Sequence, residues 1–215
     1  MTTLSLIRHG ATAGNAAGIF QGTRAYALSR HGRQQAYAVA ARLAEEHVSA
    51  VYSSALRRAL DTAGVIAQAC RCFVSPAPAW REWDMGVWTG QKSVGFYTHL
   101  ARQCLSPATY VPQGGESWGQ LQTRLLAALG QLATAQPQGE HVVCVTHGKC
   151  IEVLVQALRG QPLHLHLPYL ANGSVTRLAW DGAAWTVEAV NDVAHLEGLA
   201  LDTGGPRRWA GVQSA

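Results

Sequence analysis

Three short apolar runs, each followed by a helical pattern, constrain the fold of this chain more than any other feature. They cover residues 4–7, 50–53 (AVYS) and 141–146 (HVVCVT), and they are rich in residues that favour β-strands. Strands that alternate with helices are typical of a parallel sheet covered by helices. The sequence therefore predicts an α/β fold with a mostly parallel sheet and helices on both of its faces.

Helices are expected where apolar residues recur every three or four positions, over residues 29–46, 55–70, 117–136 and 149–159. Two further strands are expected over residues 174–180 and 186–191, joined by a turn at Asp181-Gly182. No internal repeat, linker or low-complexity segment interrupts this pattern. We therefore expect residues 1–215 to form a single domain.

The charge pattern limits the classes of partner. The formal net charge is +4, but charged residues make up only 14% of the chain and form no basic run, which argues against a nucleic-acid or membrane partner. A small anionic substrate fits better. The five cysteines are not arranged in paired CxxC units and the first residues are not those of a signal peptide, so we expect a reduced, cytoplasmic protein without disulfides. Nothing in the sequence indicates an oligomeric state.

The triplet Arg-His-Gly occurs twice, at residues 8–10 and 30–32. The first copy directly follows an apolar run, so Arg8 and His9 fall at the carboxyl end of a strand, where open α/β sheets bind ligands. The second copy follows Ser29, a good helix N-cap, and falls in the first turn of a helix. A helix start can hold an anion, but we interpret the second copy as mainly structural. The first copy is the candidate for chemistry.

Other polar residues are expected at the same edge of the sheet. Arg57 and Arg58 follow the second strand, and His147 follows the run 141–146. The Trp- and Gly-rich stretch WREWDMGVWTG supplies Glu82 and Asp84. Cationic and hydrogen-bonding groups gathered in this way are what a phosphoryl group requires.

With these motifs the chain resembles the histidine phosphatase family, the phosphoglycerate-mutase-like proteins, along nearly its whole length. The resemblance rests on RHGATAGN with FQG, YSSALRRALDTA, WREWDMGVWTG, PQGGESW, VTHGKCIEVL and NDVAHLEG. Several positions depart from the usual pattern and leave the subfamily open, namely Ala11, Ala55, Asp61 and Thr89.

The resemblance also assigns roles to residues. It implies that Asn15, Gln21 and Gly22 help to bind phosphate or substrate. It places the family's arginine on Arg58, with Arg57 as a variable neighbour, and it places the proton donor on Glu82. It gives His147 as the second histidine and Glu116 as a residue of local architecture.

Phosphoryl chemistry accounts for the same residues. A histidine attacks phosphorus when one ring nitrogen is unprotonated and the ring is held in place, and we assign this role to His9. Positive donors must hold the equatorial oxygens, for which guanidinium groups are well suited, and we assign Arg8, Arg58 and His147 to them.

One carboxyl can protonate the leaving oxygen and later take a proton from water. Glu82 lies among Trp80, Trp83, Met85 and Trp88, and desolvation there would raise its pKa as this role requires. Asp84 is the competing candidate, although a capping or solvated Asp is the more common case.

Other phosphate chemistries fit less well. The thirteen acidic residues are scattered rather than clustered at metal-ligand spacings, and we interpret His164 and His166 as surface or packing residues. No cysteine is followed by arginine at cysteine-phosphatase spacing, and HGKC is not a P-loop because Val143 replaces the earlier glycine. We therefore expect a covalent phosphohistidine mechanism without metal or cofactor.

The predicted function is that of a phosphoric monoester hydrolase, a histidine acid-type phosphatase that acts on a small-molecule phosphate ester. A phosphoglycerate-type mutase and an α-ribazole-phosphate-type phosphatase are the alternatives. A non-catalytic phospholigand-binding module is disfavoured, because a binder does not need a carboxyl acid. Resemblance to the mutases would imply a longer insertion after the acid-bearing loop and more basic residues to hold a substrate carboxylate. Residues 89–117 contain only Lys92, His99 and Arg102, so the hydrolase is favoured.

Four tryptophans bear on the choice of substrate. The resemblance places Trp80, Trp83, Trp88 and Trp118 in two loops around the active-site mouth. Each could simply pack beneath the loops. If some line the entrance, apolar leaving groups should be preferred over 3-phosphoglycerate.

Overall fold

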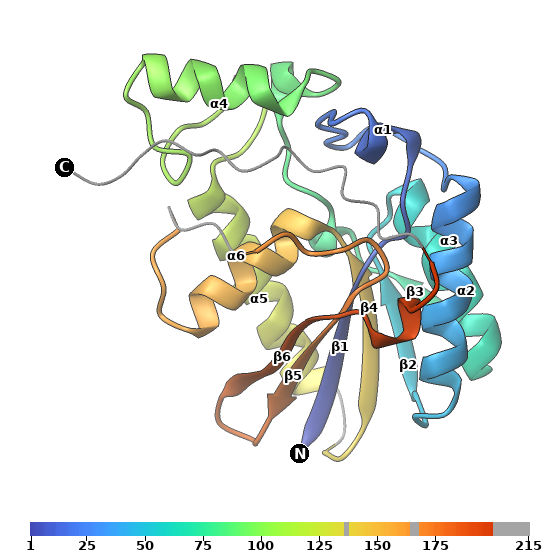
Figure 1. Cartoon of the computed structure of the whole chain (residues 1–215). Helices are drawn as coiled ribbons and strands as arrows, with labels where there is room; N and C mark the ends of the chain where they lie inside the picture. Colours follow the sequence, from blue (N-terminus) through green and yellow to red (C-terminus); the bar gives the residue numbers. More distant parts are fainter. Residues whose placement is uncertain (136–137, 164–167, 200–215) are drawn as a thin grey trace.

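A six-stranded sheet forms the centre of the protein in a computed structural model, which describes residues 1–135, 138–163 and 168–199 (Figure 1). The strand order is β3-β2-β4-β1-β5-β6. The strands are β1 (Thr2–Arg8), β2 (Ala50–Ser53), β3 (Val74–Pro76), β4 (His141–Thr146), β5 (Val175–Trp180) and β6 (Trp185–Asp192).

Four of the strands are parallel. β3, β2, β4 and β1 run in one direction, whereas β5 pairs antiparallel with β1 and β6 pairs antiparallel with β5. Arg8 lies opposite Thr146 in the register of β1 and β4, so these two strands end at the same edge. The mostly parallel sheet is confirmed, and its register brings the residues that follow β1 and β4 together.

Helices cover both faces of the sheet, as expected (Figure 1). α2 (Arg30–Ala44) and α3 (Arg57–Cys70) share one hydrophobic core with the sheet, and α5 (Trp118–Ala135) and α6 (Gly148–Leu158) share the other. Successive side chains of a strand point to opposite faces. Leu6 therefore packs with α5 and α6, while Ile7 packs with α2 and α3.

The remaining elements are short, and several were not expected. α1 (Ala13–Ala16) and α4 (Ser93–Arg102) lie beyond the carboxyl edge of the sheet (Figure 1). Three 3₁₀ helices complete the described residues, at Pro78–Trp80, Gly86–Trp88 and Ala194–Leu196. The expected helices and late strands are present, each with ends within two residues of those predicted, except that Gln136 lies outside the described residues.

Three of the four tryptophans pack beneath the loops, as the first of the two interpretations allowed. Trp80, Trp83 and Trp118 are at most 2% exposed. Trp83 meets Trp118 edge to face at 5.7 Å between ring centroids, and half-buried Trp88 packs on Phe96 of α4. Large apolar rings in these loops are stabilised more by burial against α4 and α5 than by lining a solvated mouth.

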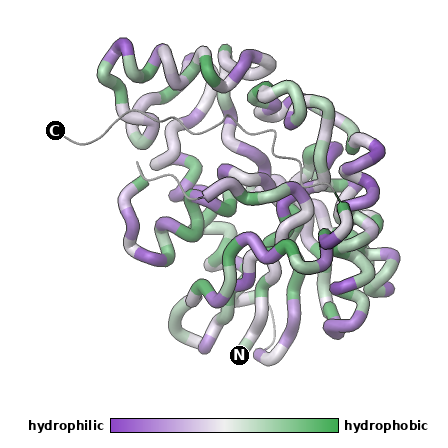
Figure 2. Tube along the Cα trace, viewed as in Figure 1, coloured by the Kyte–Doolittle hydropathy of each residue, from purple (hydrophilic) through white to green (hydrophobic). Residues whose placement is uncertain are grey.

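The surface is mixed in character. Figure 2 shows hydrophilic and hydrophobic positions alternating along the helices, as amphipathic helices on a sheet require. Within the described part of the chain, no helix combines the length and the apolar character needed to cross a bilayer. All five cysteines are free thiols.

Candidate active site

His9 lies directly after β1 and is 2% exposed. Its Nδ1 is 2.8 Å from the carbonyl oxygen of Gly10. A carbonyl only accepts, so Nδ1 carries the proton and the neutral ring has its lone pair on Nε2. Arg58 Nε donates to that Nε2 at 3.2 Å. The ring is held at both nitrogens, with Nε2 as the basic atom.

The charge environment keeps His9 neutral. Burial lowers its pKa well below the ordinary value, and the positive charges of Arg58 and Arg8 lower it further. The hydrogen bond to Gly10 acts in the opposite direction, but it is the smallest of these effects. A neutral imidazole with a fixed tautomer is what a nucleophilic histidine needs.

Three buried polar side chains position the backbone around His9, and sequence reasoning did not find them. Thr62 of α3 accepts from Gly10 N at 3.0 Å, and Gln35 of α2 accepts from Ala11 N at 2.9 Å. Asn172 donates to the carbonyl oxygen of His9 at 2.9 Å. The sequence marks Thr62 and Gln35 only as polar residues on otherwise apolar helix faces, and Asn172 only as a polar residue shortly before a strand.

The second Arg-His-Gly triplet supports the first through its glycine. Ser29 is the N-cap of α2, and its Oγ accepts from Gly32 N at 2.9 Å. A Cβ atom on Gly32 would lie 2.0 Å from Ala11 O, and one on Gly10 would lie 2.3 Å from Gly32 O. The two glycines thus allow α2 to contact the backbone that carries His9. This contact fits the structural interpretation of the second triplet.

Arg58 faces the site and Arg57 does not. Arg58 is 1% exposed, and besides His9 it donates to Gly22 O at 2.9 Å and Arg24 O at 3.0 Å. Arg57 is exposed and pairs with Asp61 at 2.6 Å one turn further along α3. The assignment of the family's arginine to Arg58 therefore agrees with the geometry.

Arg8 is the last residue of β1. Its Nη1 donates to the carbonyl oxygen of Leu170, and its guanidinium carbon lies 5.0 Å from the ring centroid of Tyr169. Among the described residues, its buried Nε has no hydrogen-bond partner. Arg8 therefore retains a donor for an anion.

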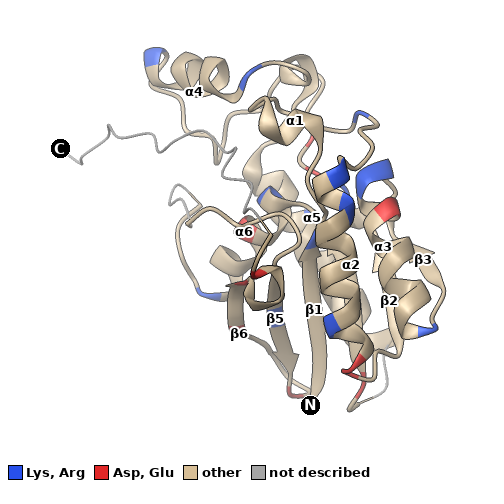
Figure 3. Cartoon of the chain, turned by 45° about the vertical axis from the view of Figure 1, so that its right-hand side comes forward, with Lys and Arg blue, Asp and Glu red and all other residues tan. Residues whose placement is uncertain are grey.

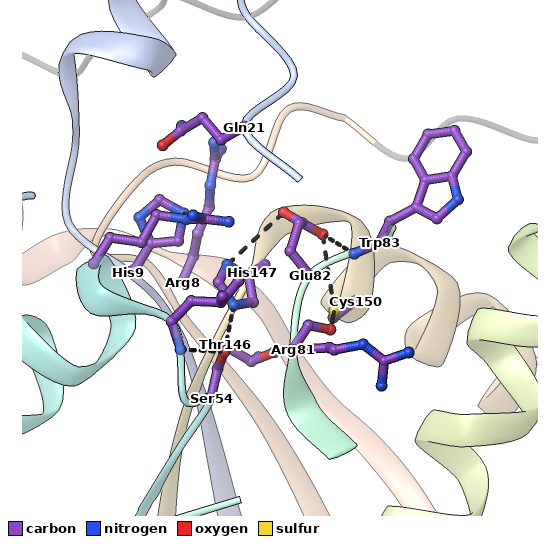
Figure 4. Close-up of polar contacts among 12 residues, drawn as sticks. Arg8, His9, Gln21, Ser54, Arg81, Glu82, Trp83, Thr146, His147 and Cys150 are labelled. Atoms are coloured by element: carbon purple, nitrogen blue, oxygen red, sulfur yellow. Dashed lines mark hydrogen bonds and ion pairs between the residues drawn. The ribbon is translucent and has the colours of Figure 1, made fainter. Parts of the chain in front are cut away.

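His147 follows β4 and is fully buried. Its Nε2 is hydrogen-bonded to Ser54 Oγ at 2.8 Å, and its ring centroid lies 5.2 Å from that of His9. Its Nδ1 lies 3.9 Å from Glu82 Oε2, so His147 stands between His9 and Glu82 (Figure 4). Burial lowers the pKa of His147 well below its ordinary value, and Arg58 contributes to this shift.

Glu82 reaches this centre from the loop between β3 and α4. Its Oε1 accepts from Trp83 N at 2.9 Å, and its side chain is 19% exposed. Burial raises the pKa of Glu82, against the opposing effects of Arg58, the Trp83 N–H, Arg8 and Lys149. Asp84 instead accepts from Gly86 N at 3.0 Å within its own turn. The geometry therefore favours Glu82 over Asp84 as the acid.

Glu116 anchors the loop that carries Glu82, in the architectural role expected for it. Its Oε1 accepts from Asp84 N at 3.1 Å and from Arg124 Nη2 at 2.5 Å. Its carbonyl oxygen accepts from Trp83 Nε1 at 2.6 Å. These bonds attach the two residues that follow Glu82 to Glu116 and, through Arg124, to α5.

The three remaining expected site residues lie on the segment that follows His9. Asn15 Oδ1 accepts from Thr12 N at 3.0 Å and caps α1, and Gln21 Oε1 accepts from Thr12 Oγ1 at 3.0 Å. Gly22, with φ +48°, presents its carbonyl oxygen to Arg58. Figure 4 places Gln21 on the same side of the centre as His9 and Arg8. Binding of phosphate by these residues remains a prediction.

The electrostatic field at the carboxyl edge of the sheet favours an anion. α3 and α6 begin directly after β2 and β4, and neither has a side-chain N-cap hydrogen bond. Helix N-termini attract anions. Figure 3 shows basic residues at the starts of α2 and α3, with an acidic residue of α3 close to them. His164 and His166 lie outside the described residues.

The arrangement defines a class of protein: an α/β sheet with paired neutral histidines, buried arginines and a protonatable carboxyl at its carboxyl edge. The family model of the histidine phosphatase superfamily (branch 1) matches residues 4–193. The chain belongs to this superfamily. It is 36% identical to the probable phosphoglycerate mutase GpmB of Erwinia tasmaniensis, over 94% of this chain and 98% of that protein.

Two solved structures are similar in both sequence and fold. Bacillus stearothermophilus YhfR is 32% identical with a TM-score of 0.83, covering 92% of this chain and all of that one. The mycobacterial glucosyl-3-phosphoglycerate phosphatase complexed with VO3 is 31% identical with a TM-score of 0.78, over 88% of this chain and 98% of that one. The superfamily expectation and the phosphoglycerate-mutase-like fold are thereby confirmed.

Proposed function

We propose that this protein hydrolyses phosphate monoesters of small molecules through a phosphohistidine formed on His9. The observation that carries the proposal is the state of the His9 ring, whose Nδ1 proton is fixed on Gly10 O while Nε2 faces Arg58. A basic ring nitrogen beside a guanidinium can attack a phosphorus atom whose oxygens that guanidinium holds.

The first step transfers the phosphoryl group. Nε2 of His9 forms the N–P bond, the P–O bond to the leaving group breaks, and Glu82 gives its proton to the leaving oxygen. In the second step water attacks phosphorus, the N–P bond breaks, and the Glu82 carboxylate takes the proton from water. Inorganic phosphate leaves, and both residues return to their starting states.

The charged neighbours stabilise the transferred group. Arg8, Arg58 and His147 would hold the equatorial oxygens, where charge accumulates. Asn15, Gln21 and Gly22 would bind the same phosphate from the segment beyond His9. Glu82 lies 3.9 Å from His147, so proton transfer and phosphate binding would occur within one contiguous site.

A mutase, which passes the phosphoryl group to a second substrate hydroxyl, is the second candidate. Its support is the 36% identity to a protein named probable phosphoglycerate mutase. Hydrolysis is favoured because the basic residues of the segment around α4 do not gather at Glu82. His99 packs on Trp88 and Tyr110, and Lys92 and Arg102 are exposed.

The test is to trap the intermediate. Wild-type protein mixed with a ³²P-labelled monoester in EDTA and quenched without acid should carry acid-labile, alkali-stable label. His9→Ala should abolish the label, whereas His31→Ala, the matched change in the second triplet, should retain it. Label that persists in His9→Ala would refute the assignment. Isomerisation of 3-phosphoglycerate faster than phosphate release would replace the hydrolase with the mutase.

A further inference from the structure

A buried hydrogen bond between Ser54 and His147 takes no part in the steps of the proposed reaction. His147 Nε2 lies 2.8 Å from Ser54 Oγ, and both side chains are fully buried. A hydroxyl can donate or accept, whereas a neutral imidazole has one nitrogen that donates and one that accepts. The direction of this hydrogen bond therefore decides which nitrogen of His147 carries the proton.

Two other contacts of Ser54 settle that direction. Its backbone N donates to Val145 O at 2.9 Å, so the pairing of β2 with β4 places Ser54 beside His147 at the end of β4. Its Oγ accepts from Leu56 N at 3.3 Å. Among the described residues, His147 Nε2 is then the acceptor within reach of the hydroxyl proton. A buried hydroxyl that does not donate destabilises the fold, so Ser54 donates and Nε2 accepts.

Donation by Ser54 leaves the proton of His147 on Nδ1. Burial lowers the pKa of His147 well below its ordinary value, so the ring is neutral and holds a single proton. Nδ1 lies 3.9 Å from Glu82 Oε2, which is too long for a hydrogen bond, and among the described residues it has no hydrogen-bond partner. Ser54 and Glu82 lie on opposite sides of the ring (Figure 4). The Nδ1–H group therefore faces the site as an unused donor.

The same contact distinguishes the two buried histidines, whose ring centroids are 5.2 Å apart. His9 has its Nδ1 proton on Gly10 O and its basic Nε2 beside Arg58, which also serves the phosphoryl oxygens in the proposed reaction. His147 has its basic Nε2 on Ser54, a hydroxyl that is closed to substrate by burial. His147 is thus prepared to donate to the phosphoryl group and not to attack it.

We propose that Ser54 is a positioning residue that fixes His147 in its Nδ1–H tautomer and so directs a hydrogen-bond donor at the phosphoryl oxygens. This inference deepens the proposed function, on which the role of the donor rests. It also gives a role to the second serine of the YSSALRRALDTA motif, which sequence reasoning did not assign.

The tautomer can be measured without substrate. In protein with ¹⁵N-labelled histidine, a long-range ¹H–¹⁵N correlation spectrum distinguishes ring nitrogens that carry a proton from those that do not. The signals of His147 are those that disappear in His147→Gln. We expect a protonated Nδ1 and a bare Nε2 at neutral pH. A bare Nδ1, or a proton on both nitrogens, would overturn the proposal.

Variants of the two neighbouring serines test the cause. Ser54→Ala removes the hydroxyl, so His147 should lose its single tautomer. The kcat/KM for phenyl phosphate should fall by about one to two decades, somewhat less than the two to three decades that removal of a whole donor costs. Ser54→Thr keeps the hydroxyl and should restore the tautomer and most of the rate. Ser53→Ala, the matched change, removes only the hydrogen bond from Ser53 Oγ to Ser54 O and should change neither.

The outcomes separate this proposal from the proposed function. If wild-type protein releases no phosphate from phenyl phosphate, the hydrolase function fails, whereas the tautomer is still measured in the free protein. If Ser54→Ala keeps the Nδ1–H tautomer, the positioning role is overturned even if the rate falls, because Ser54 is then merely structural. Should Ser54→Ala fail to fold, the spectrum of the wild-type protein decides the question alone.

Discussion

Burial acts in opposite directions on the two kinds of proton carrier in this site. It lowers the pKa of His9 and His147 and raises that of Glu82, because an apolar environment disfavours the charged form of each. A nucleophilic histidine must be neutral, and a carboxyl acid must be protonated. One physical cause therefore gives both kinds of residue the protonation state that the proposed phosphoryl transfer requires.

The dependence of activity on pH follows from these shifts. We expect kcat/KM to fall as pH rises through the raised pKa of Glu82, above its ordinary value of about 4.3, because the acid loses its proton. At low pH, kcat/KM should also fall, but only below about 6.5, the ordinary pKa of histidine, because the pKa of His9 is lowered. The measurement is kcat/KM for an alkyl phosphate between pH 4 and 9 (about five units).

Glu82→Gln tests the same residue directly. It should slow hydrolysis of alkyl phosphates by about two to four decades and remove the alkaline limb of the pH profile. Single-turnover phosphorylation by an aryl phosphate should suffer less, because its leaving group needs less protonation. Asp84→Asn is the matched control and should keep the pH profile. Equal losses with both ester types would mean that Glu82 only binds substrate.

At the scale of elements, the start of α2 sets the position of His9, the proposed nucleophile. Gly32 contacts the backbone of Gly10 and Ala11, and Gln35 one turn later binds Ala11 N. These contacts come from a helix that the sequence marks only by its N-cap and its periodicity. The second Arg-His-Gly triplet thus acts on the site through backbone packing.

Gly32→Ala tests this contact. The added Cβ would meet Ala11 O at 2.0 Å, so the backbone must shift, and we expect a loss of about 1–3 kcal/mol in the free energy of unfolding. The rate of phosphohistidine formation should fall as well. Gly130→Ala in α5 has nothing within 4 Å and should stabilise the protein by about 0.5–1 kcal/mol. Urea unfolding measures both, and equal effects of the two changes would contradict the packing argument.

For the whole molecule, two buried histidines link folding stability to pH. His9 and His147 have lowered pKa values in the folded state, so the unfolded chain binds more protons below about pH 6.5. Each should lower the free energy of unfolding by about 1.4 kcal/mol per pH unit below that value. Glu82, with its raised pKa, opposes this trend but is a single group.

Urea unfolding between pH 7.5 and 5 (about two and a half units) measures this slope. His147→Gln should reduce the slope of the free energy of unfolding against pH by the equivalent of about one proton per molecule. His47→Gln, a change at an exposed position, should leave this slope unaltered. A slope that His147→Gln does not change would show that His147 is charged or solvated in the folded protein.

The sequence by itself determined the layers of the fold and the edge of the sheet at which the candidate site lies. Alternating apolar runs and helical periods are local patterns, and each strand-helix pair brings the residues after its strand to one edge of a parallel sheet. Arg8, His9 and His147 could be placed in this way, because their placement depends only on residues near each other in the chain and on the direction of the strands. The resemblance to the family's motif separated Arg58 from Arg57.

Only the tertiary structure decided which side chains face the site from other elements. The three-residue strand β3 and helix α4 lack a distinctive local pattern. β3 forms by pairing with β2, and α4 packs Phe96 and Leu100 into the core. The sequence left open whether the tryptophans of the acid loop line the mouth or pack beneath it, and packing against α4 and α5 buries Trp80 and Trp83 and half-buries Trp88. Lys149 meets the ring of Trp118, 31 positions earlier in the chain, only through folding, and no local spacing could reveal that contact.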